Sequence, residues 1–302
     1  MDFYISIRAK APVRFRYNLF WHDGLGILVT ENMGNLGLQL RTGCSGWGYD
    51  DWVGPFYKPG TKKSEYLRQY ATAFDLVEID SSFYNLPSPA TVASWRQAVP
   101  DDFLFTAKFP KRITHELKLA GVEEQVERVY RSMGQLRGKL GVLVVQLPPS
   151  IVYEKHWETV KAFVDLLAPK IRHAIEFRNE SWFRDDVLNL LRERNVAIVW
   201  SQNQYMATPA VVTADFTYLR LVGERDIEKF DRIVKDRSAE MKDWRDRLES
   251  AESELAQAFV ILNNHFAGFS PASVNHFRKL SGLDEIPFPA SHVGQKSLAE
   301  FS

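Results

Sequence analysis

The chain has 302 residues, of which 45% are hydrophobic and 25% charged, as is ordinary for a globular protein with one large domain or two small ones. Lysine plus arginine equals aspartate plus glutamate at 38 each, so no global positive field favours nucleic-acid binding. The single cysteine, Cys44, excludes an internal disulfide and a cysteine-rich zinc site.

The expected compartment is the cytoplasm. A chain with one thiol is typical of a reducing, intracellular environment. No apolar run approaches the roughly 20 residues that cross a bilayer. The first residues also lack the charged start and apolar core of a signal peptide. We therefore expect no membrane partner.

Residues 1–37 mix basic, aromatic and glycine-rich pieces without sustained periodicity. We expect them to form an N-terminal extension of uncertain structure ahead of a domain that spans residues 38–302. Met33 stands just before the first clear strand, so a biological start at Met33 is a hypothesis. The intact mass of the protein from its native source tests it, and a mass that includes residue 1 contradicts it.

From residue 38 onward, short apolar runs alternate with amphipathic segments. The runs predict eight strands, at Leu38–Thr42, Leu76–Asp80, Leu104–Lys108, Gly141–Leu147, His173–Arg178, Val196–Trp200, Thr217–Leu221 and Phe259–Asn263. Helices are expected at Ser64–Phe74, from Pro89 to about Ala98 with Ser88 as N-cap, at 122–136, 156–167, 185–194 and 238–257, and from Ser270 onward.

Eight strands that alternate with helices over about 250 residues predict an α/β fold of the TIM type, a (β/α)8 barrel. The same alternation also permits an open doubly wound sheet.

The predicted strands carry charged residues at alternate positions, most of them late in the strand. In a barrel, period-two alternation would turn one face toward the helices and the polar face inward, near the C-terminal mouth where barrel active sites lie. A single β-bulge would reverse this orientation. The inward set has three carboxylates against three cations, with amide and imidazole groups at strand ends: Glu78, Asp80 and Glu176; Lys108, Arg178 and Arg220; and Gln146, Asn263, Asn264 and His265.

Unpaired buried charges are costly, so these groups should pair with one another or bind a charged ligand. One interpretation is a closed ion network that only fills the barrel. The functional interpretation is favoured because valine, isoleucine and leucine would fill a barrel without that cost.

Aromatic residues gather in the loops that follow the predicted strands. The loop "GCSGWGYDDWVGPFYKPG" contains Trp47 and Tyr49, "SSFYNLP" contains Phe83 and Tyr84, and Trp182 follows the fifth strand. These rings could stack on a sugar or a base, or could be part of the core.

Phosphate and metal signals are weaker. Loops after the seventh and eighth strands are the usual phosphate site of this architecture, but the glycine spacing here matches no phosphate-loop motif. His115 and His265 could reach the mouth with Asp80 and Glu176, yet no H-x-x-x-H pair occurs. No cofactor is predicted, and a catalytic metal is the less favoured alternative.

Seven motifs in order resemble one known family: "GCSGWGYDDWVGPFY", "VEIDSSFYNLPSPATVASW", "FTAKFPKRITH", "VQLPPS", "EFRNESWF", "YLRLVG" and "NNHFAGFSPASV". Over residues 38 to 282 the chain resembles the domain-of-unknown-function 72 (DUF72) family, the YecE-like proteins. The resemblance implies a TIM barrel and no established reaction. The family's strand-seven motif commonly reads Arg-x-His-Gly, and Val222 stands at the histidine position here.

Three functional hypotheses follow. The leading one is an enzyme that acts on a small polar or anionic metabolite at the barrel mouth, by carboxylate acid/base chemistry of the hydrolase, lyase or isomerase kind. Glu176, Asp80 and Glu78 are its candidate catalytic residues. Its candidate binding residues are Lys108, Gln146, Arg178, Trp182, Arg220, Asn263, Asn264, His265, Tyr84 and Trp47.

The second hypothesis is a nucleic-acid-binding or nuclease-like barrel. The fold of the DUF72 family is similar to xylose-isomerase-like barrels, which include an abasic-site endonuclease, and this is an analogy of fold. It would use a basic rim of Lys62, Lys63, Lys111 and Arg112 and bind in a salt-dependent way. The third hypothesis is a non-catalytic ligand-binding or scaffold barrel. The sequence favours no oligomeric state.

Overall fold

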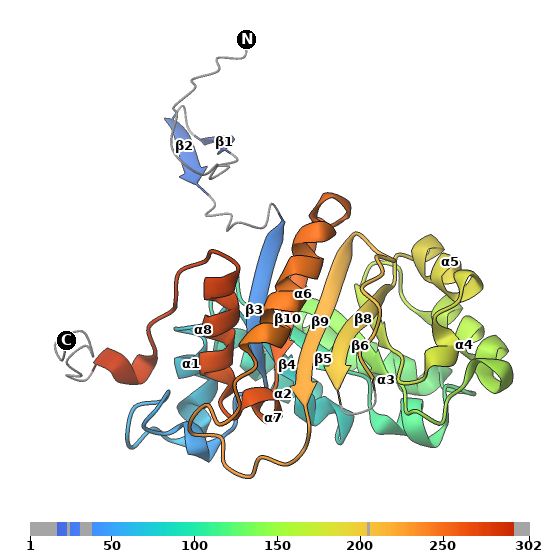
Figure 1. Cartoon of the computed structure of the whole chain (residues 1–302), viewed down its shortest axis with the longest axis horizontal. Coiled ribbons are helices and arrows are strands. Elements are labelled where there is room, and N and C mark those ends of the chain that lie inside the picture. The colour runs from blue at the N-terminus through green and yellow to red at the C-terminus, as the bar shows by residue number, and fades with distance from the viewer. Residues whose placement is uncertain (1–16, 23–24, 31–37, 204–205, 293–302) are drawn as a thin grey trace.

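Eight parallel strands close into a barrel in the order β10-β3-β4-β5-β6-β7-β8-β9 (Figure 1). The computed structural model describes residues 17–22, 25–30, 38–203 and 206–292. The closed sheet confirms the predicted barrel and excludes the open doubly wound sheet. The strands are β3 (Gln39–Ser45), β4 (Leu76–Ile79), β5 (Leu104–Lys108), β6 (Leu140–Gln146), β7 (His173–Glu176), β8 (Ala197–Asn203), β9 (Phe216–Gly223) and β10 (Gln257–Leu262).

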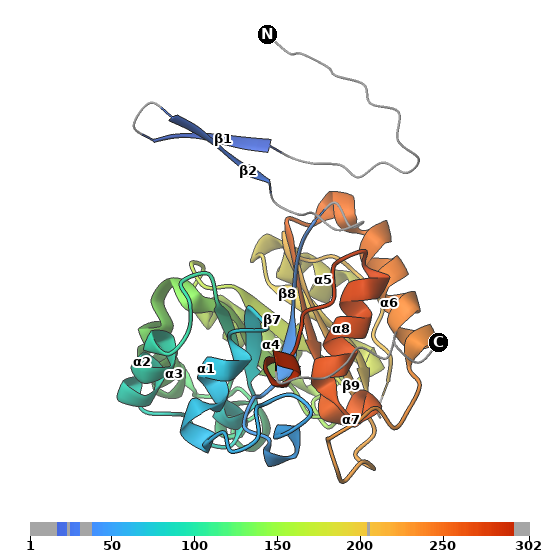
Figure 2. The same ribbon diagram turned by 90° about the vertical axis from the view of Figure 1, so that its left-hand side faces the viewer.

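Helices lie around the outside of the barrel (Figures 1 and 2). None of the helices in the described ranges is long and apolar enough to cross a membrane. They are α1 (Tyr66–Tyr70), α2 (Pro89–Gln97), α3 (Glu123–Met133), α4 (Tyr153–Leu166), α5 (Asp185–Glu193), α6 (Ser238–Ser250), α7 (Asn264–Ala267) and α8 (Ser270–Leu280).

One connection departs from the strand–helix alternation. Residues 206–215, described between β8 and β9, form no helix. They pack on β8 instead, where the Ile198 and Ser201 backbone N–H groups donate to the hydroxyls of Thr213 and Thr208, each at 2.8 Å. The two threonines thereby provide acceptors for buried backbone donors of β8.

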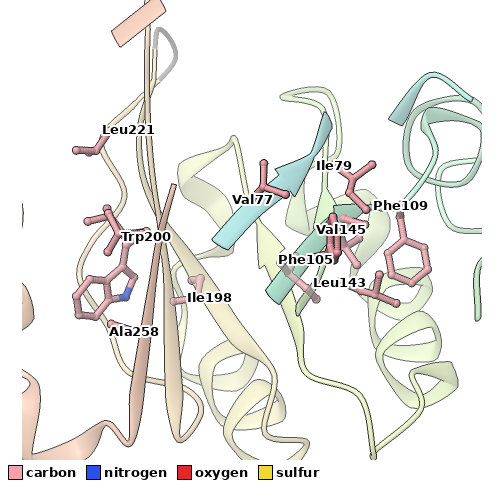
Figure 3. Packing of buried hydrophobic residues seen from close by; sticks show 14 of the residues in the cluster. Val77, Ile79, Phe105, Phe109, Leu143, Val145, Ile198, Trp200, Leu221 and Ala258 are labelled. Carbon is pink, nitrogen blue, oxygen red and sulfur yellow. The ribbon is translucent and has the colours of Figure 1, made fainter. Parts of the chain in front are cut away.

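The alternation along the strands separates two apolar layers. One lies between the strands and the helices and includes Val77, Phe105 and Val145 (Figure 3). The other contains the alternate residues, such as Val144 and Phe259, and fills the barrel interior. Because Glu78, Lys108, Glu176 and Arg220 share the parity of the interior layer, they point inward. The hydrophobic residues of the interior layer are Leu76, Val142, Val144, Ala174, Ala197, Val199, Ala214, Phe216, Tyr218, Phe259 and Ile261.

The ends of several elements differ from the sequence prediction. Ser88 does cap α2, since its hydroxyl accepts from the Thr91 N–H at 3.1 Å and Pro89 is the first helical residue. The predicted helix 238–257 is too long. α6 ends at Ser250, because the chain must turn through a short 3-10 segment, Glu252–Glu254, to begin β10.

Other elements are also shorter than the sequence predicts. α1 covers five residues rather than the predicted Ser64–Phe74. β4 ends one residue before Asp80, which opens a 3-10 turn, and β7 ends two residues before Arg178. Both side chains therefore stand just beyond the ends of their strands.

The N-terminal extension contains a hairpin. β1 (Tyr17–His22) pairs antiparallel with β2 (Leu25–Thr30). Met33 lies outside the described residues, so the hypothesis of a start there stays a prediction.

Gly43 allows β3 and β4 to approach each other. A Cβ at this position would meet the Leu76 carbonyl oxygen at 2.0 Å. The same carbonyl accepts from the Tyr70 hydroxyl at 2.8 Å, and that hydroxyl accepts from the Cys44 N–H at 2.8 Å. The Tyr70 hydroxyl therefore bridges the two strands beside Gly43.

We predict that Gly43→Ala lowers the free energy of unfolding by about 3 kcal/mol, because the added methyl group must push β4 away. Urea denaturation measures the change. Gly138→Ala is the control, since a Cβ there meets nothing within 4 Å and the change should be within about 1 kcal/mol. Equal stability of the two variants would contradict the packing argument.

Candidate functional site

A pocket of about 230 Å³ lies at the C-terminal mouth of the barrel. Nine of the thirteen sequence-predicted site residues line it: Asp80, Tyr84, Lys108, Gln146, Arg178, Arg220, Asn263, Asn264 and His265. Lys108 and Gln146 are the last residues of β5 and β6, and Asn263 follows β10 directly. The strands therefore bring together residues that are up to 185 positions apart, from Asp80 to His265.

Arg220 on β9 connects two carboxylates from other strands. Its Nε and Nη2 donate to the two oxygens of Glu78, each at 3.0 Å, in a bidentate pair with β4. Its Nη1 donates to Glu176 on β7 and to the Gln146 side-chain oxygen at 3.3 Å. Arg220 is 2% exposed and both glutamates are 0% exposed, so this ion network is fully buried.

Glu78 is surrounded by donors. The Ser45 hydroxyl donates to Oε1 at 2.8 Å and the Tyr218 hydroxyl to Oε2 at 3.0 Å. The Lys108 ammonium lies 3.3 Å from Oε1. A buried carboxylate needs this many partners to offset the loss of its hydration.

The upper layer of the network faces the pocket. Lys108 Nζ also pairs with Asp80, whose side chain is 35% exposed. Arg178 Nε donates to Glu176 at 2.7 Å, and its side chain is 13% exposed. Glu78 and Glu176 do not line the pocket and lie beneath it. Asp80 is thus the carboxylate of the network that a ligand can contact.

The glutamates are held in the ionised form. Burial raises the pKa of Glu78, but the charges of Arg220 and Lys108, with the hydrogen bond from Ser45, outweigh it and bring the pKa to about 2. Burial also raises the pKa of Glu176, and Arg220 and Arg178 outweigh it, so that its pKa is lowered. Near neutral pH both side chains are carboxylates, which is the state that pairs with the arginines.

The loop after β9, residues 224–237, supplies pocket residues that periodicity does not predict. Arg225 and Phe230 line the pocket from this loop. The Phe230 N–H donates to the Asp51 carboxylate at 2.9 Å, which ties the loop to the one after β3. The Phe230 ring packs edge-on against Tyr49 at 5.8 Å and against His265 at 4.9 Å, and forms an aromatic wall.

Two tryptophans from the sequence prediction lie elsewhere. Trp182 is fully buried, its Nε1 donates to the Ile151 carbonyl at 2.8 Å, and its ring stacks on Phe177 at 4.9 Å. Trp47 packs edge-on against Trp95 at 5.4 Å. Neither lines the pocket, so the structure does not bring them to the other site residues. Among the pocket aromatics, Tyr84 is 59% exposed.

Metal ligands do not cluster in the described part of the chain, where no three His, Cys, Asp or Glu side chains are placed to hold an ion. His115 instead packs edge-on against Phe83 at 5.0 Å. Burial raises the pKa of the Cys44 thiol to about 12, so this side chain stays protonated.

Three cations of the predicted basic rim are paired with carboxylates. Lys63 lies 2.7 Å from Asp50, and Arg112 and Lys111 lie 3.0 and 4.0 Å from Glu116. Their charges are therefore partly neutralised before any nucleic acid approaches.

Comparison with known proteins identifies the family. The family model "Protein of unknown function DUF72" matches residues 41–295, and the chain belongs to this family. The protein UPF0759 YecE of Escherichia coli K12 is 27% identical over 214 residues, which cover 63% of this chain and 76% of the relative. UPF0759 YunF of Bacillus subtilis is 24% identical over 257 residues, covering 76% of this chain and 90% of the relative.

Solved structures agree on the fold. A DUF72 family protein from Thermotoga maritima superimposes with a TM-score of 0.69 at 25% identity, covering 80% of this chain and 98% of that one. A DUF72 family protein from Enterococcus faecalis superimposes with a TM-score of 0.66 at 22% identity, covering 82% of this chain and 100% of that one.

We predict that Glu176→Gln lowers the free energy of unfolding by about 3–5 kcal/mol, because Arg220 and Arg178 lose their shared carboxylate in a buried place. Chemical denaturation at neutral pH measures it. Glu116→Gln is the matched control, since Glu116 pairs with Arg112 at the surface and should cost less than about 1 kcal/mol. If Glu176→Gln lowers the free energy of unfolding no more than the control variant does, the buried network is contradicted.

We also predict an acid-sensitive stability. The folded pKa of Glu78, about 2, lies below its ordinary value of 4.5, and that of Glu176 is lowered too. Their stabilising contribution is therefore complete above pH 4.5 and is lost as the pH falls toward 2. Glu78 alone should contribute about 3 kcal/mol to the free energy of unfolding above this range. Urea midpoints measured across this pH range test the prediction. A urea concentration at the midpoint that stays constant as the pH falls below 4.5 would contradict it.

Proposed function

We propose that the barrel mouth of this DUF72 family member binds a small anionic metabolite and that Asp80 transfers a proton to or from it. The observation that carries the proposal is the composition of the pocket wall. Four cations line it, Lys108, Arg178, Arg220 and Arg225, and Asp80 is the one carboxylate among its lining residues.

The charge balance supports an anionic ligand. Within the barrel, three carboxylates are paired with three cations, as described above. Arg225 is exposed and has no ion pair with any residue in the described ranges. The site as a whole therefore carries four cations against three carboxylates, and a bound anion would balance the surplus charge.

The two kinds of carboxylate suit different roles. A group with a pKa near 2, as in Glu78, is a weak base and holds no proton to donate near neutrality. Glu78 and Glu176 would hold Arg220 and Lys108 in position. Asp80 reaches the pocket and is partly exposed, so it can meet a substrate proton, while Lys108 beside it would stabilise developing negative charge.

The pocket favours a small ligand. Its volume of about 230 Å³ is below the roughly 300–1,000 Å³ of sites for drug-sized molecules. The aromatic wall of Tyr49 and Phe230 offers an apolar surface on one side. A compact organic anion with a carbon backbone fits both features better than a polynucleotide, for which the paired rim cations offer little free charge.

We predict that Asp80→Asn keeps ligand binding and lowers turnover at least about 100-fold, because the amide cannot accept a proton. The substrate is first found by screening a set of small organic anions for those that raise the melting temperature. Turnover of the hits is then followed by NMR.

Asp101→Asn is the matched control, since the Asp101 side chain is fully exposed, pairs with Lys139 and does not line the pocket. It should leave turnover unchanged. Undiminished turnover by Asp80→Asn would contradict the role of Asp80. A screen in which no small anion raises the melting temperature would contradict the proposed function as a whole.

A further inference from the structure

We propose that the side of the pocket formed after β9 and β10 is a phosphate-binding subsite, made by Arg225, Asn264 and His265, so that the ligand is a small phosphomonoester. This inference rests on the proposed function and names its substrate class. Three features of these residues support it: a buried amide nitrogen and a ring nitrogen without a hydrogen-bond partner, and a cation without an ion pair, in the part of the chain that the structure describes.

Asn264 has a buried donor in the wall of the pocket. It is 1% exposed and lines the pocket. Its Oδ1 accepts from the Ser270 N–H at 3.0 Å and from the Ser270 hydroxyl at 2.9 Å, which fixes the orientation of the amide. Its Nδ2 has no hydrogen-bond partner of normal geometry among the described residues.

A weak hydrogen-bonding contact from Asn264 lowers the pKa of the Tyr49 hydroxyl. That influence is the smallest among its causes, and the hydroxyl already donates to the Ser45 carbonyl at 2.8 Å. A buried amide that lacks an acceptor loses free energy, and a ligand oxygen in the pocket would recover it.

His265 adds a second donor. Its Nδ1 is buried and has no partner within the described ranges. Burial and the nearby charge of Arg225 lower the pKa of the ring, so it is neutral near pH 7. A neutral ring that carries its proton on Nδ1 donates a hydrogen bond to an anion. The edge-on contact with Phe230 restricts the ring to this place.

Arg225 supplies the charge. Its guanidinium lies close enough to His265 to affect the pKa of that ring, and it forms no ion pair in the described part of the chain. A planar guanidinium binds two phosphate oxygens at once, and amide and imidazole N–H groups can bind a third.

Gly223 allows the chain that carries Arg225 to lie close to Asn264 and His265. Its φ of +72° is in the left-handed region, and a Cβ there would meet the His265 carbonyl oxygen at 2.5 Å. The end of β9 therefore packs directly against the start of α7, with Arg225 two residues later. β9 and β10 are the seventh and eighth strands of the barrel, whose loops are the frequent phosphate site of this architecture.

The subsite leaves the rest of the pocket for chemistry. Asp80 follows β4 directly and Lys108 ends β5, and the two residues of this ion pair are not among the three proposed for the phosphate. A phosphomonoester bound at Arg225 would then extend its carbon backbone toward Asp80. Binding energy at the phosphate would position the reacting atoms, which is a frequent use of such groups in small substrates.

The test uses a matched series of probes, glycerol 1-phosphate, glycerate and glycerol, together with inorganic phosphate. Isothermal titration calorimetry with the full chain gives the dissociation constants. We expect the two phosphate probes to bind at least about tenfold more tightly than glycerate, and glycerol not to bind.

Two variants locate the site. Arg225→Gln should weaken phosphate binding at least about tenfold, and Asn264→Asp should do so as strongly, because it keeps the acceptor for Ser270 and replaces the donor by a repelling carboxylate. Arg232→Gln is the control on the same loop. Arg232 is exposed, pairs with Asp231 and does not line the pocket, so its loss should leave binding unchanged.

The outcomes separate the two proposals. Equal affinity for glycerate and glycerol 1-phosphate would overturn the phosphate subsite and leave the anion-binding function standing. Phosphate binding that neither Arg225→Gln nor Asn264→Asp weakens would also overturn the subsite. If the wild-type protein binds none of the charged probes at about 10 mM, both proposals are wrong.

Discussion

The charged layer of the barrel depends on the ion pairs that Arg220 forms with two buried glutamates. One guanidinium on β9 donates to Glu78 on β4 and to Glu176 on β7, strands that are not its neighbours in the sheet. Burying a guanidinium in an apolar interior costs several kcal/mol unless carboxylates pair with its charge. This pairing fixes the positions of Lys108 and Arg178 in turn, because each shares one of the two glutamates with Arg220.

The barrel interior is thus divided into two levels. An apolar layer fills the lower part, and a charged layer with Arg220 at its centre closes it from above. The ionised glutamates form the floor, and Asp80, Lys108 and Arg178 stand on it and face the pocket. A ligand would meet side chains whose positions are set by buried ion pairs, so little ordering would remain to be done on binding.

Much of this arrangement follows from the sequence, because strands have a strict period of two. The alternation of Glu78 with Val77 and Ile79, and of Arg220 with Leu219 and Leu221, predicts the inward face, and the structure has these residues there. Loops have no such period. Arg225 and Phe230 lie in residues 224–237, where neither the pattern nor the composition indicates contact with the pocket.

Aromatic residues show the same limit. Trp182 follows closely after Glu176 and Arg178, so the sequence makes it a candidate for the pocket, but its ring stacks on Phe177 in the core. The over-long helix at 238–257 has a related cause. Its helical composition continues through Glu254, and only the need to begin β10 at Gln257 ends the helix at Ser250. Tertiary geometry decides such cases, because local preference is compatible with both outcomes.

Native mass spectrometry can show whether the barrel mouth holds an anionic metabolite. The purified protein is incubated with the small-molecule fraction of a cell extract, desalted rapidly and weighed intact, and the released ligand is then identified under denaturing conditions. We predict a mass increase from one small anion per chain. The mass of the bare polypeptide after incubation, or of a complex with a nucleic acid, would contradict it.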